Sequence, residues 1–356
     1  MMASLRLGLS SAAVLFLLLP LLLPVAPAVR ADDEHICSEP SGPQVQLPRE
    51  WHLWKQEHGK TYSSFKTELE RHIVWQANQQ YIDTHNRYNS SFGYTLAMNR
   101  LGDLTEAEYQ KQYGCIDHAD NGSSPFVFYY SPVSEDASNL PTSVDWHTKA
   151  AVSPVKDQGD CCASYAFSAV GTLEGMEALA NGYLTTFSEQ NIIDCSGPYG
   201  NHGCSKGAVD RAFEYVIEQG INTDTVYPFR GARKRCHYKS SKPGVTLRSY
   251  QWIRKGRETD LQSAVAMEGP ISAAIDASHN TFRFYASGVY DQPTCSSNKV
   301  NHAVLVAGYG TDEQGKDYWS VKNSWGVLWG EDGYIRMSRN QNNQCGIASR
   351  AIFPAL

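Results

Sequence analysis

The segment Gln158-Gly-Asp-Cys-Cys-Ala-Ser164 constrains this chain more than any other, because it places a serine at the head of an apolar helix. From Ser164 to Ala180 apolar residues recur at helical spacing, and Asn181-Gly182 is a typical helix stop. The first turn of a helix has backbone N–H groups without intrahelical acceptors and carries the positive end of the helix dipole. Both features favour negative charge beside the Ser164 side chain.

The same segment resembles the nucleophile motif of papain-like cysteine proteases, Gln-Gly-x-Cys-x-x-Cys-Trp-Ala-Phe-Ser. When Gln158 and Cys161 are aligned with that motif, Ser164 stands at the nucleophilic cysteine and Tyr165 at the tryptophan. A serine at this position, with these neighbours, is similar to the silicateins, papain-fold proteins of sponge spicules that promote silica condensation. The resemblance covers essentially the whole chain. It implies an α+β papain-like fold, with a helical left domain and an antiparallel β-barrel right domain.

Two later motifs match the rest of such a site. His302 opens an apolar strand in the sequence Asn-His-Ala-Val-Leu-Val, and Asn323 begins Asn-Ser-Trp-Gly, the segment whose asparagine orients the catalytic imidazole in this family. A lone histidine on a strand is usually structural. Here the three motifs follow one another in the order of the family, which supports a catalytic role for His302. The resemblance implies Ser164 as nucleophile and His302 as base. It also implies an oxyanion hole formed by the Gln158 side chain and the Ser164 backbone N–H.

A serine changes the chemistry of this site. A cysteine thiol beside an imidazolium is ionised at rest, whereas a hydroxyl must lose its proton as it attacks. His302 would therefore act first as general base and then as general acid. The silicatein resemblance implies attack by Ser164 Oγ on the silicon of silicic acid or of a silicon alkoxide. A catalytically silent structural protein that templates silica and a weak serine-type peptidase are the alternatives.

One residue of the expected cleft wall departs from the family. The family sequence Gly-Cys-x-Gly-Gly lets an extended peptide pair with the wall, and here it reads Gly203-Cys-Ser-Lys-Gly207. Lys206 introduces a long cation. We therefore expect ordinary peptide binding to be disfavoured and silicate to be attracted.

The first residues are typical of a secretory signal. Arg6 precedes an apolar run over residues 12–23, and small residues follow it. Pro20 and Pro24 interrupt the run, which is too short to span a bilayer comfortably. We expect residues 1–31 to be a signal peptide, with no membrane anchor. The resemblance then implies an extracellular or secretory-vesicle location such as the axial filament of a spicule.

A helical leader follows the signal. Apolar residues from Pro48 to Tyr113 lie mostly at helical spacings. The segment Asn99–Asp103 and five earlier residues resemble the two motifs of cathepsin L-type propeptides, and an ordinary amphipathic helix pair is the alternative. These five residues are Arg71, Trp75, Asn78, Ile82 and Asn86. Residues 121–138 are rich in Ser, Pro and Asp and indicate a linker open to cleavage. We expect an inhibitory propeptide with its linker over residues 32–139 and a mature domain over residues 140–356.

The nine cysteines can form disulfides in a secreted chain. The resemblance implies three pairs, namely Cys161–Cys204, Cys195–Cys236 and Cys295–Cys345. Cys37 and Cys115 lie in the leader and are expected to pair with each other or with nothing. Cys162 is left over, either as a buried small residue, as a wrong partner for Cys204, or as a link between chains. Asn89 and Asn121 begin acceptor sequences for N-glycosylation.

Charge divides near residue 140. From Leu140 onward, 21 Lys and Arg balance 21 Asp and Glu, so the net charge of −6 lies in the preceding residues. A near-neutral mature part favours self-association, which fits the filaments implied by the resemblance. Between Arg230 and Arg257 there are ten Lys and Arg and no acidic residue, which indicates either a solvated loop face or a docking strip for a polyanion. The spacing does not favour nucleic acid, and we expect no cofactor or metal.

Overall fold

The computed structural model describes residues 46–88, 93–117, 125–132 and 139–356. The expected signal peptide, Cys37, Asn89 and Asn121 lie outside the described residues. Residues Leu47–Leu356 pack as one unit. Within the described ranges, no helix combines the length and the apolar character needed to cross a membrane.

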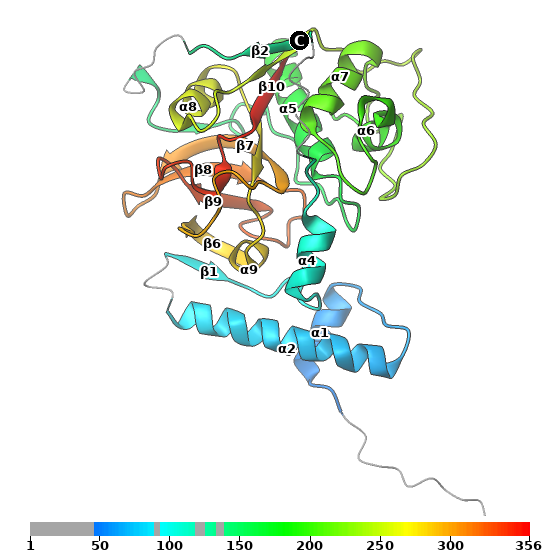
Figure 1. Cartoon of the computed structure of the whole chain (residues 1–356), viewed down its shortest axis with the longest axis vertical. Helices are drawn as coiled ribbons and strands as arrows, with labels where there is room; N and C mark the ends of the chain where they lie inside the picture. The colour runs from blue at the N-terminus through cyan, green and yellow to red at the C-terminus, as the bar shows by residue number, and fades with distance from the viewer. Residues whose placement is uncertain (1–45, 89–92, 118–124, 133–138) are drawn as a thin grey trace, which may run out of the picture. The chain divides into compact units, whose positions relative to one another are not determined.

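The leader is helical, as its apolar spacing predicts (Figure 1). Its elements are α1 (Arg49–Glu57), α2 (Phe65–Arg87), β1 (Tyr94–Leu96) and α4 (Glu106–Tyr113). The first two helices meet at a small core of Trp51, Trp54 and Trp75, whose ring centroids lie 5.1 to 6.2 Å apart. This core is separate from the main core, so the two helices form a layer of their own.

Residues of the propeptide-like motif join α2 to the segment that follows it. Arg71 donates to both carboxylate oxygens of Glu108 in α4, at 2.7 and 2.8 Å. Asn78 donates to the carbonyls of Gly102 and Leu104, at 2.8 and 3.0 Å. The spacing of the motif therefore reflects contacts that hold the leader together.

Helices precede strands in the rest of the chain. The first half contains β3 (Val144–Asp145), α5 (Ser164–Asn181), α6 (Glu189–Cys195), η2 (Gly197–Tyr199) and α7 (Val209–Gln219). The second half contains β4 (Ser249–Trp252), α8 (Glu258–Met267), β5 (Ile271–Ile275), α9 (Asn280–Arg283), β6 (Tyr285–Tyr290), β7 (His302–Thr311), β8 (Asp317–Lys322), β9 (Tyr334–Ser338), η3 (Gln344–Gly346) and β10 (Ala351–Ala355). The predicted stop of α5 is confirmed, because Gly182 has a left-handed φ of 79° that glycine adopts readily.

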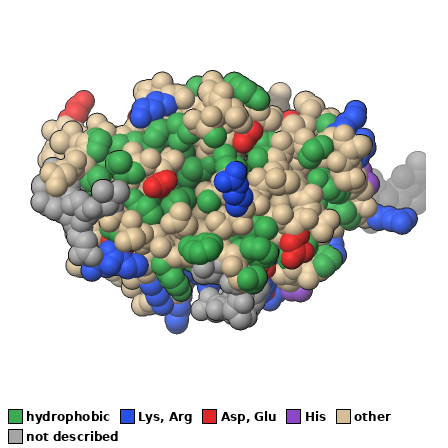
Figure 2. All heavy atoms as spheres, turned by 90° about the horizontal axis from the view of Figure 1, so that it is seen from above, with side chains coloured by type: hydrophobic (Ala, Val, Ile, Leu, Met, Phe, Trp, Pro, Cys, Tyr) green, Lys and Arg blue, Asp and Glu red, His purple; other side chains and the backbone are tan. Residues whose placement is uncertain are grey.

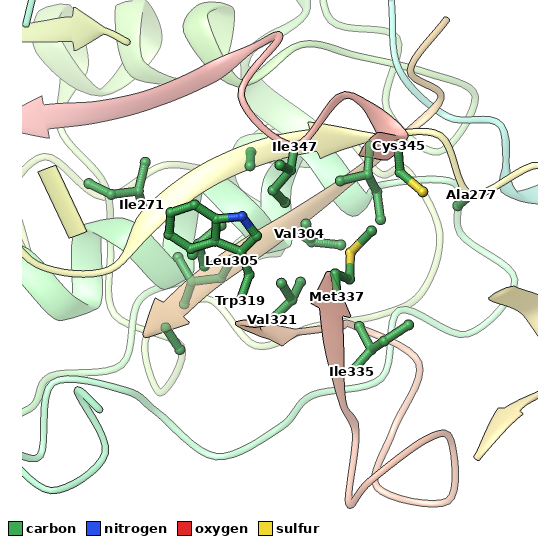
Figure 3. Close-up of a cluster of buried hydrophobic side chains, with 14 of the residues drawn as sticks. Ile271, Ala277, Val304, Leu305, Trp319, Val321, Ile335, Met337, Cys345 and Ile347 are labelled. Atoms are coloured by element: carbon green, nitrogen blue, oxygen red, sulfur yellow. The ribbon is translucent and has the colours of Figure 1, made fainter. Parts of the chain in front are cut away.

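The strands form one sheet in the order β1-β6-β9-β8-β7-β5-β10-β4-β2, with β3 on β7. Most neighbours are antiparallel, as predicted, but β6 with β9 and β2 with β4 are parallel. Apolar side chains from β5, β7, β8 and β9 fill the core (Figure 3). The pairing of Ile275 with His302 fixes the first residue of β7 at the end of β5.

Part of the expected linker is a strand. β2 (Val127–Tyr129) pairs with β4, and Tyr130 is buried, with its hydroxyl 3.0 Å from Ser263 Oγ and its ring against Phe353. The prediction of an open linker is wrong for these residues, because their aromatic side chains suit the half-buried surface of an edge strand. Residues 133–138 of the linker lie outside the described part.

Arg283 fixes the leader to the barrel. Its guanidinium is fully buried and donates to the leader carbonyls of Leu101 and Leu104. It also lies 5.3 Å from the ring centroid of Tyr109 in α4 and 4.4 Å from that of Phe284. A single barrel side chain thus satisfies two buried leader carbonyls.

The substitution Arg283→Met is expected to lower the unfolding free energy of the complete chain by about 2–4 kcal/mol, because the carbonyls of Leu101 and Leu104 each lose a charged donor. The chain without its leader should lose much less. Thermal unfolding of both forms measures the difference. Arg339 is a matched control, because it is also buried but donates to Gln262 and to Gly310, both outside the leader. Arg339→Met should destabilise both forms, and an equal effect of Arg283→Met on both would contradict the assignment.

Candidate active site

Ser164 is the first residue of α5 and is fully buried. Its Oγ accepts a hydrogen bond from the backbone N–H of Ala303, at 3.2 Å. Ala163 precedes the helix and provides no side-chain cap, so the N–H groups of the first turn are not satisfied by capping. The predicted nucleophile therefore lies at an uncapped helix N-terminus, beside the start of β7.

The hydrogen bonds around Asn323 define the tautomer of His302. The amide oxygen of Asn323 accepts from the backbone N–H of Ser324, at 2.8 Å, and lies 2.8 Å from His302 Nε2. Because this oxygen can only accept, Nε2 carries the proton and Nδ1 carries the lone pair. Among the described residues, His302 Nδ1 has no hydrogen-bond partner. It is the nitrogen available to take a proton.

Burial keeps this imidazole neutral. His302 is fully buried, which lowers its pKa to about 4, while the hydrogen bond to Asn323 acts in the opposite direction. The ring of Trp325 lies 4.9 Å from that of His302, centroid to centroid. At neutral pH the site therefore holds an uncharged base that is shielded from water.

Gln158 is held beside the helix start. Its Oε1 accepts from Ser324 Oγ at 2.6 Å, and its Nε2 donates to the Cys161 carbonyl at 2.9 Å. An amide nitrogen has two hydrogens, so one remains for a further acceptor. The structure thus brings the four predicted residues together. No hydrogen bond joins Ser164 to His302 in the described structure.

The leader runs across this site. The backbone N–H groups of Cys115 and Ile116 donate to the Asn301 carbonyl, at 2.8 and 3.3 Å. The Gly207 N–H donates to the Cys115 carbonyl at 3.1 Å, and the Gly207 carbonyl accepts from the Asp117 N–H at 2.8 Å. The extended segment after α4 therefore occupies the cleft between Gly207 and the start of β7.

Lys206 contacts the leader where it lies along this wall. Its side chain is 52% exposed, and its Nζ lies 3.6 Å from Asp117 Oδ2. Asp117 belongs to the segment whose backbone pairs with the N–H and the carbonyl of Gly207. The cleft wall can therefore bind extended backbone despite the lysine. The expectation that Lys206 disfavours ordinary peptides stays a prediction.

Cys162 has a partner that the sequence did not indicate. It forms a disulfide with Cys115, with their Cα atoms 5.2 Å apart. Cys162 is buried, but it is paired within the chain, which none of its three possibilities foresaw. Both expectations for Cys115, a bond to Cys37 or no bond at all, are wrong. The sequence contains both cysteines, Cys115 in the leader and Cys162 two residues before Ser164. Only the path of the leader across the cleft brings them close enough to pair.

The structure also contains the three disulfides that the resemblance implied. These are Cys161–Cys204, Cys195–Cys236 and Cys295–Cys345, with Cα distances of 4.6, 4.9 and 4.7 Å. Asp276 and His279 lie close to the Cys295 sulfur. Because this sulfur is in a disulfide, the cluster lacks the thiolate that a metal would bind.

Sequence reasoning missed a buried charge cluster behind the site. Lys156 Nζ lies 2.8 Å from Glu174 and 2.6 Å from Glu189, and Lys322 donates to the Ser153 carbonyl at 2.7 Å. Burial raises the pKa of Glu189 to about 7 and lowers the pKa of Lys322 to about 8. Lys322 directly precedes the asparagine that binds the imidazole, so the cluster supports that loop.

The basic segment is exposed but not wholly unpaired. Arg254 and Arg257 both form ion pairs with Asp260. The other eight form no ion pair within the described part of the chain and, unlike Arg254, are exposed. They are Arg230, Arg233, Lys234, Arg235, Lys239, Lys242, Arg248 and Lys255.

Comparisons with known proteins agree with this architecture. The family described as papain family cysteine protease matches residues 140–355, and the cathepsin propeptide inhibitor domain matches residues 51–109. A silicatein of Petrosia ficiformis is 47% identical over 88% of this chain and 95% of its own length. Cathepsin L1 of Drosophila melanogaster is 43% identical over 86% and 84%. The structure of procathepsin L 3 from the larval midgut of Tenebrio molitor matches with a TM-score of 0.80 and 40% identity, over 86% of this chain and 98% of that one.

Proposed function

This chain belongs to the papain family of cysteine proteases, and from this membership we propose that it is a silica-condensing member with Ser164 as nucleophile. Its hydrolase relatives support an enzyme of the peptidase family. The observation that carries the proposal is a hydroxyl at the head of α5, where the family has a thiol, beside a neutral His302 bound to Asn323. The similarity to a silicatein supports silicon as the electrophile.

Serine in place of the family's cysteine removes the thiolate chemistry. His302, which would transfer the proton, and Asn323, which binds its ring, are retained. A hydroxyl does not ionise at neutral pH, so it needs a base as it attacks. His302 Nδ1 has the free lone pair for this role, and Asn323 fixes the ring through Nε2. The unused N–H of Gln158 and the Ser164 backbone N–H would stabilise the developing oxyanion.

The proposed reaction has two steps. Ser164 Oγ attacks the silicon of silicic acid or an alkoxide, His302 takes the hydroxyl proton, and this proton leaves with the departing water or alcohol. A silanol oxygen of a second molecule then attacks the Ser164-bound silicon and forms an Si–O–Si bond. The silanol proton returns to Ser164 Oγ through His302. The enzyme is regenerated, and each cycle joins two silicon centres.

The test compares silica formation from a soluble silicon alkoxide at neutral pH. Protein made as the complete precursor and then freed of its leader should lose about 10-fold or more of its rate in Ser164→Ala and in His302→Ala, because proton transfer contributes at least this much. Ser241→Ala is the matched control, since this serine is exposed and remote from the motif. Rates equal to the parent in both site variants would overturn the proposal.

A template is the second candidate, favoured by the eight exposed and unpaired cations of the basic segment. Replacing Lys234, Arg235 and Lys239 by Gln would then reduce silica formation, while Ser164→Ala would not. A weak peptidase is the third candidate, because Gly207 pairs with extended backbone. Cleavage of short fluorogenic peptides by the parent would favour it.

We further propose that residues 140–356 act as the mature, secreted domain and that copies associate. Its formal charge is balanced, and large apolar side chains such as Tyr183, Met267 and Leu328 are exposed on it. Figure 2 shows apolar side chains gathered in several places on one face, with Lys and Arg scattered singly. Such a surface supports filament assembly on silica, as the silicatein similarity suggests.

A further inference from the structure

We propose that the Cys115–Cys162 disulfide keeps the leader covalently bound across the active-site cleft after the chain is cut, and that a thiol reductant opens the site. Removal of an inhibitory leader is usually pictured as a single backbone cleavage. In this chain one cut would leave the leader attached. Opening of the cleft would therefore require both a backbone cleavage and the reduction of a disulfide.

The position of the two cysteines carries this inference. Cys115 precedes, and Cys162 follows, every peptide bond between residues 118 and 140. A cut anywhere in that interval leaves the two pieces joined by the disulfide. The other three disulfides link residues that all follow residue 140, so none of them crosses the cut.

The tether holds the segment that covers the site. The Cys115 carbonyl accepts from Gly207 N–H, and its N–H donates to Asn301, the residue before His302. Cys162 lies two residues before Ser164. Because the segment cannot diffuse away, its effective concentration at the cleft stays in the millimolar range or above. Even weak backbone pairing then keeps the cleft occupied.

Burial makes the disulfide resistant to reduction while the leader occupies the cleft. Cys115 is fully buried and Cys162 is 7% exposed. A thiolate can reach the Cys162 sulfur only when the segment lifts partially. Loosening of the leader and reduction are therefore coupled, and an oxidising compartment would keep the cut protein closed.

Release is a two-electron reduction by a thiol. A thiolate attacks Cys162 Sγ, forms a mixed disulfide and expels Cys115 as a thiolate, which takes up a proton. A second thiol molecule then attacks the mixed disulfide and releases Cys162 as a thiol. The products are two protein thiols and one molecule of oxidised reductant, so the leader becomes free to leave.

The test uses the complete precursor, cut in the linker by a broad-specificity protease. On denaturing electrophoresis without reductant the cut parent should run as one species, and with dithiothreitol as two. The variant Cys115→Ser/Cys162→Ala should give two species in both conditions. Release of the parent leader without reductant would overturn the proposal. Mapping of the intact parent by mass spectrometry provides a second check, and pairing of Cys162 with any cysteine other than Cys115 would also overturn it.

Hydrogen exchange at the Gly207 amide tests whether the tether also blocks the cleft. In the cut parent this amide should exchange about 100-fold more slowly before reduction than after it, as expected when a tethered segment becomes free. The cut double variant should exchange at the rate of the reduced parent, with or without reductant. Rapid exchange in the tethered parent would show that the disulfide does not close the site. Neither readout uses silicon, so failure here is distinct from failure of the proposed silica chemistry.

Discussion

Replacement of Ser164 by Cys is expected to raise hydrolysis of short fluorogenic peptides by at least about 100-fold over the parent, once the leader has been released. The substitution restores the residue that the family uses. A thiol at the head of α5 gains from the helix dipole and from His302, and it ionises far more readily than a hydroxyl. His302 and its hydrogen bond to Asn323 are unchanged by the substitution.

The cleft can support this activity because it already binds extended backbone. Gly207 pairs with the leader through both its N–H and its carbonyl, with Lys206 Nζ 3.6 Å from Asp117 of the same segment. A substrate peptide can use the same pairing after the leader leaves. The missing element for peptide cleavage is therefore the nucleophile and not the binding surface.

Ser168→Cys is the matched control for this measurement. Ser168 lies one helical turn further along α5, is buried, and its Oγ contacts Ser272 Oγ and the Val304 carbonyl at 2.6 Å. A cysteine there adds a thiol to the same helix away from His302, so peptide cleavage should stay at the parent level. If Ser164→Cys also stays at that level, the cleft does not position peptides for attack, and the third candidate function fails with it.

Local sequence patterns predicted the elements that carry the site. The apolar run after Ser164 and the Asn-Gly stop define α5 within one residue at its end, and β7 begins at His302 as predicted. These elements depend on periodicity and on a glycine with positive φ, both of which are local properties. The motifs then indicated the candidate site, because Ser164 and His302 each begin such an element and Asn323 follows β8.

The features that were missed depend on how distant segments meet. Cys115 and Cys162 are 47 residues apart, and nothing local shows that the leader crosses the cleft in the register that pairs them. The strand Val127–Tyr129 in the expected linker was missed because its partner β4 lies more than 100 residues later. The cluster of Lys156 with Glu174 and Glu189 likewise unites separate elements. Contacts of this kind follow from packing and not from sequence periodicity.

Acid is expected to weaken closure of the leader over the site, by about 100-fold between pH 7 and pH 4. In the closed chain burial lowers the pKa of His302 from its ordinary 6.5 to about 4. Closure therefore needs the neutral imidazole. Below pH 6.5 the open site binds a proton that the closed site excludes, so closure weakens as the pH falls toward 4. Above pH 6.5 this group contributes no pH dependence.

The contacts of α4 should not produce the same acid response. The bidentate hydrogen bond from Arg71 holds the pKa of Glu108 at about 2, so this carboxylate stays ionised at pH 4 and keeps its partner. We therefore expect α2 and α4 to stay joined at acid pH, while the segment after α4 binds the cleft more weakly. His302 differs because no opposite charge compensates its protonation, and only the Asn323 hydrogen bond favours the charged form.

The Cys115→Ser/Cys162→Ala variant, cut in the linker, makes this response measurable, because its leader is held without a covalent bond. The fraction of leader that separates in gel filtration should rise steeply as the pH falls from 7 to 4. Adding His302→Gln removes the titrating group but keeps a polar side chain of similar size, so release should then become nearly independent of pH over this range. If the Gln variant releases its leader with the same acid dependence, the proton is taken up elsewhere, and the burial of His302 does not control closure.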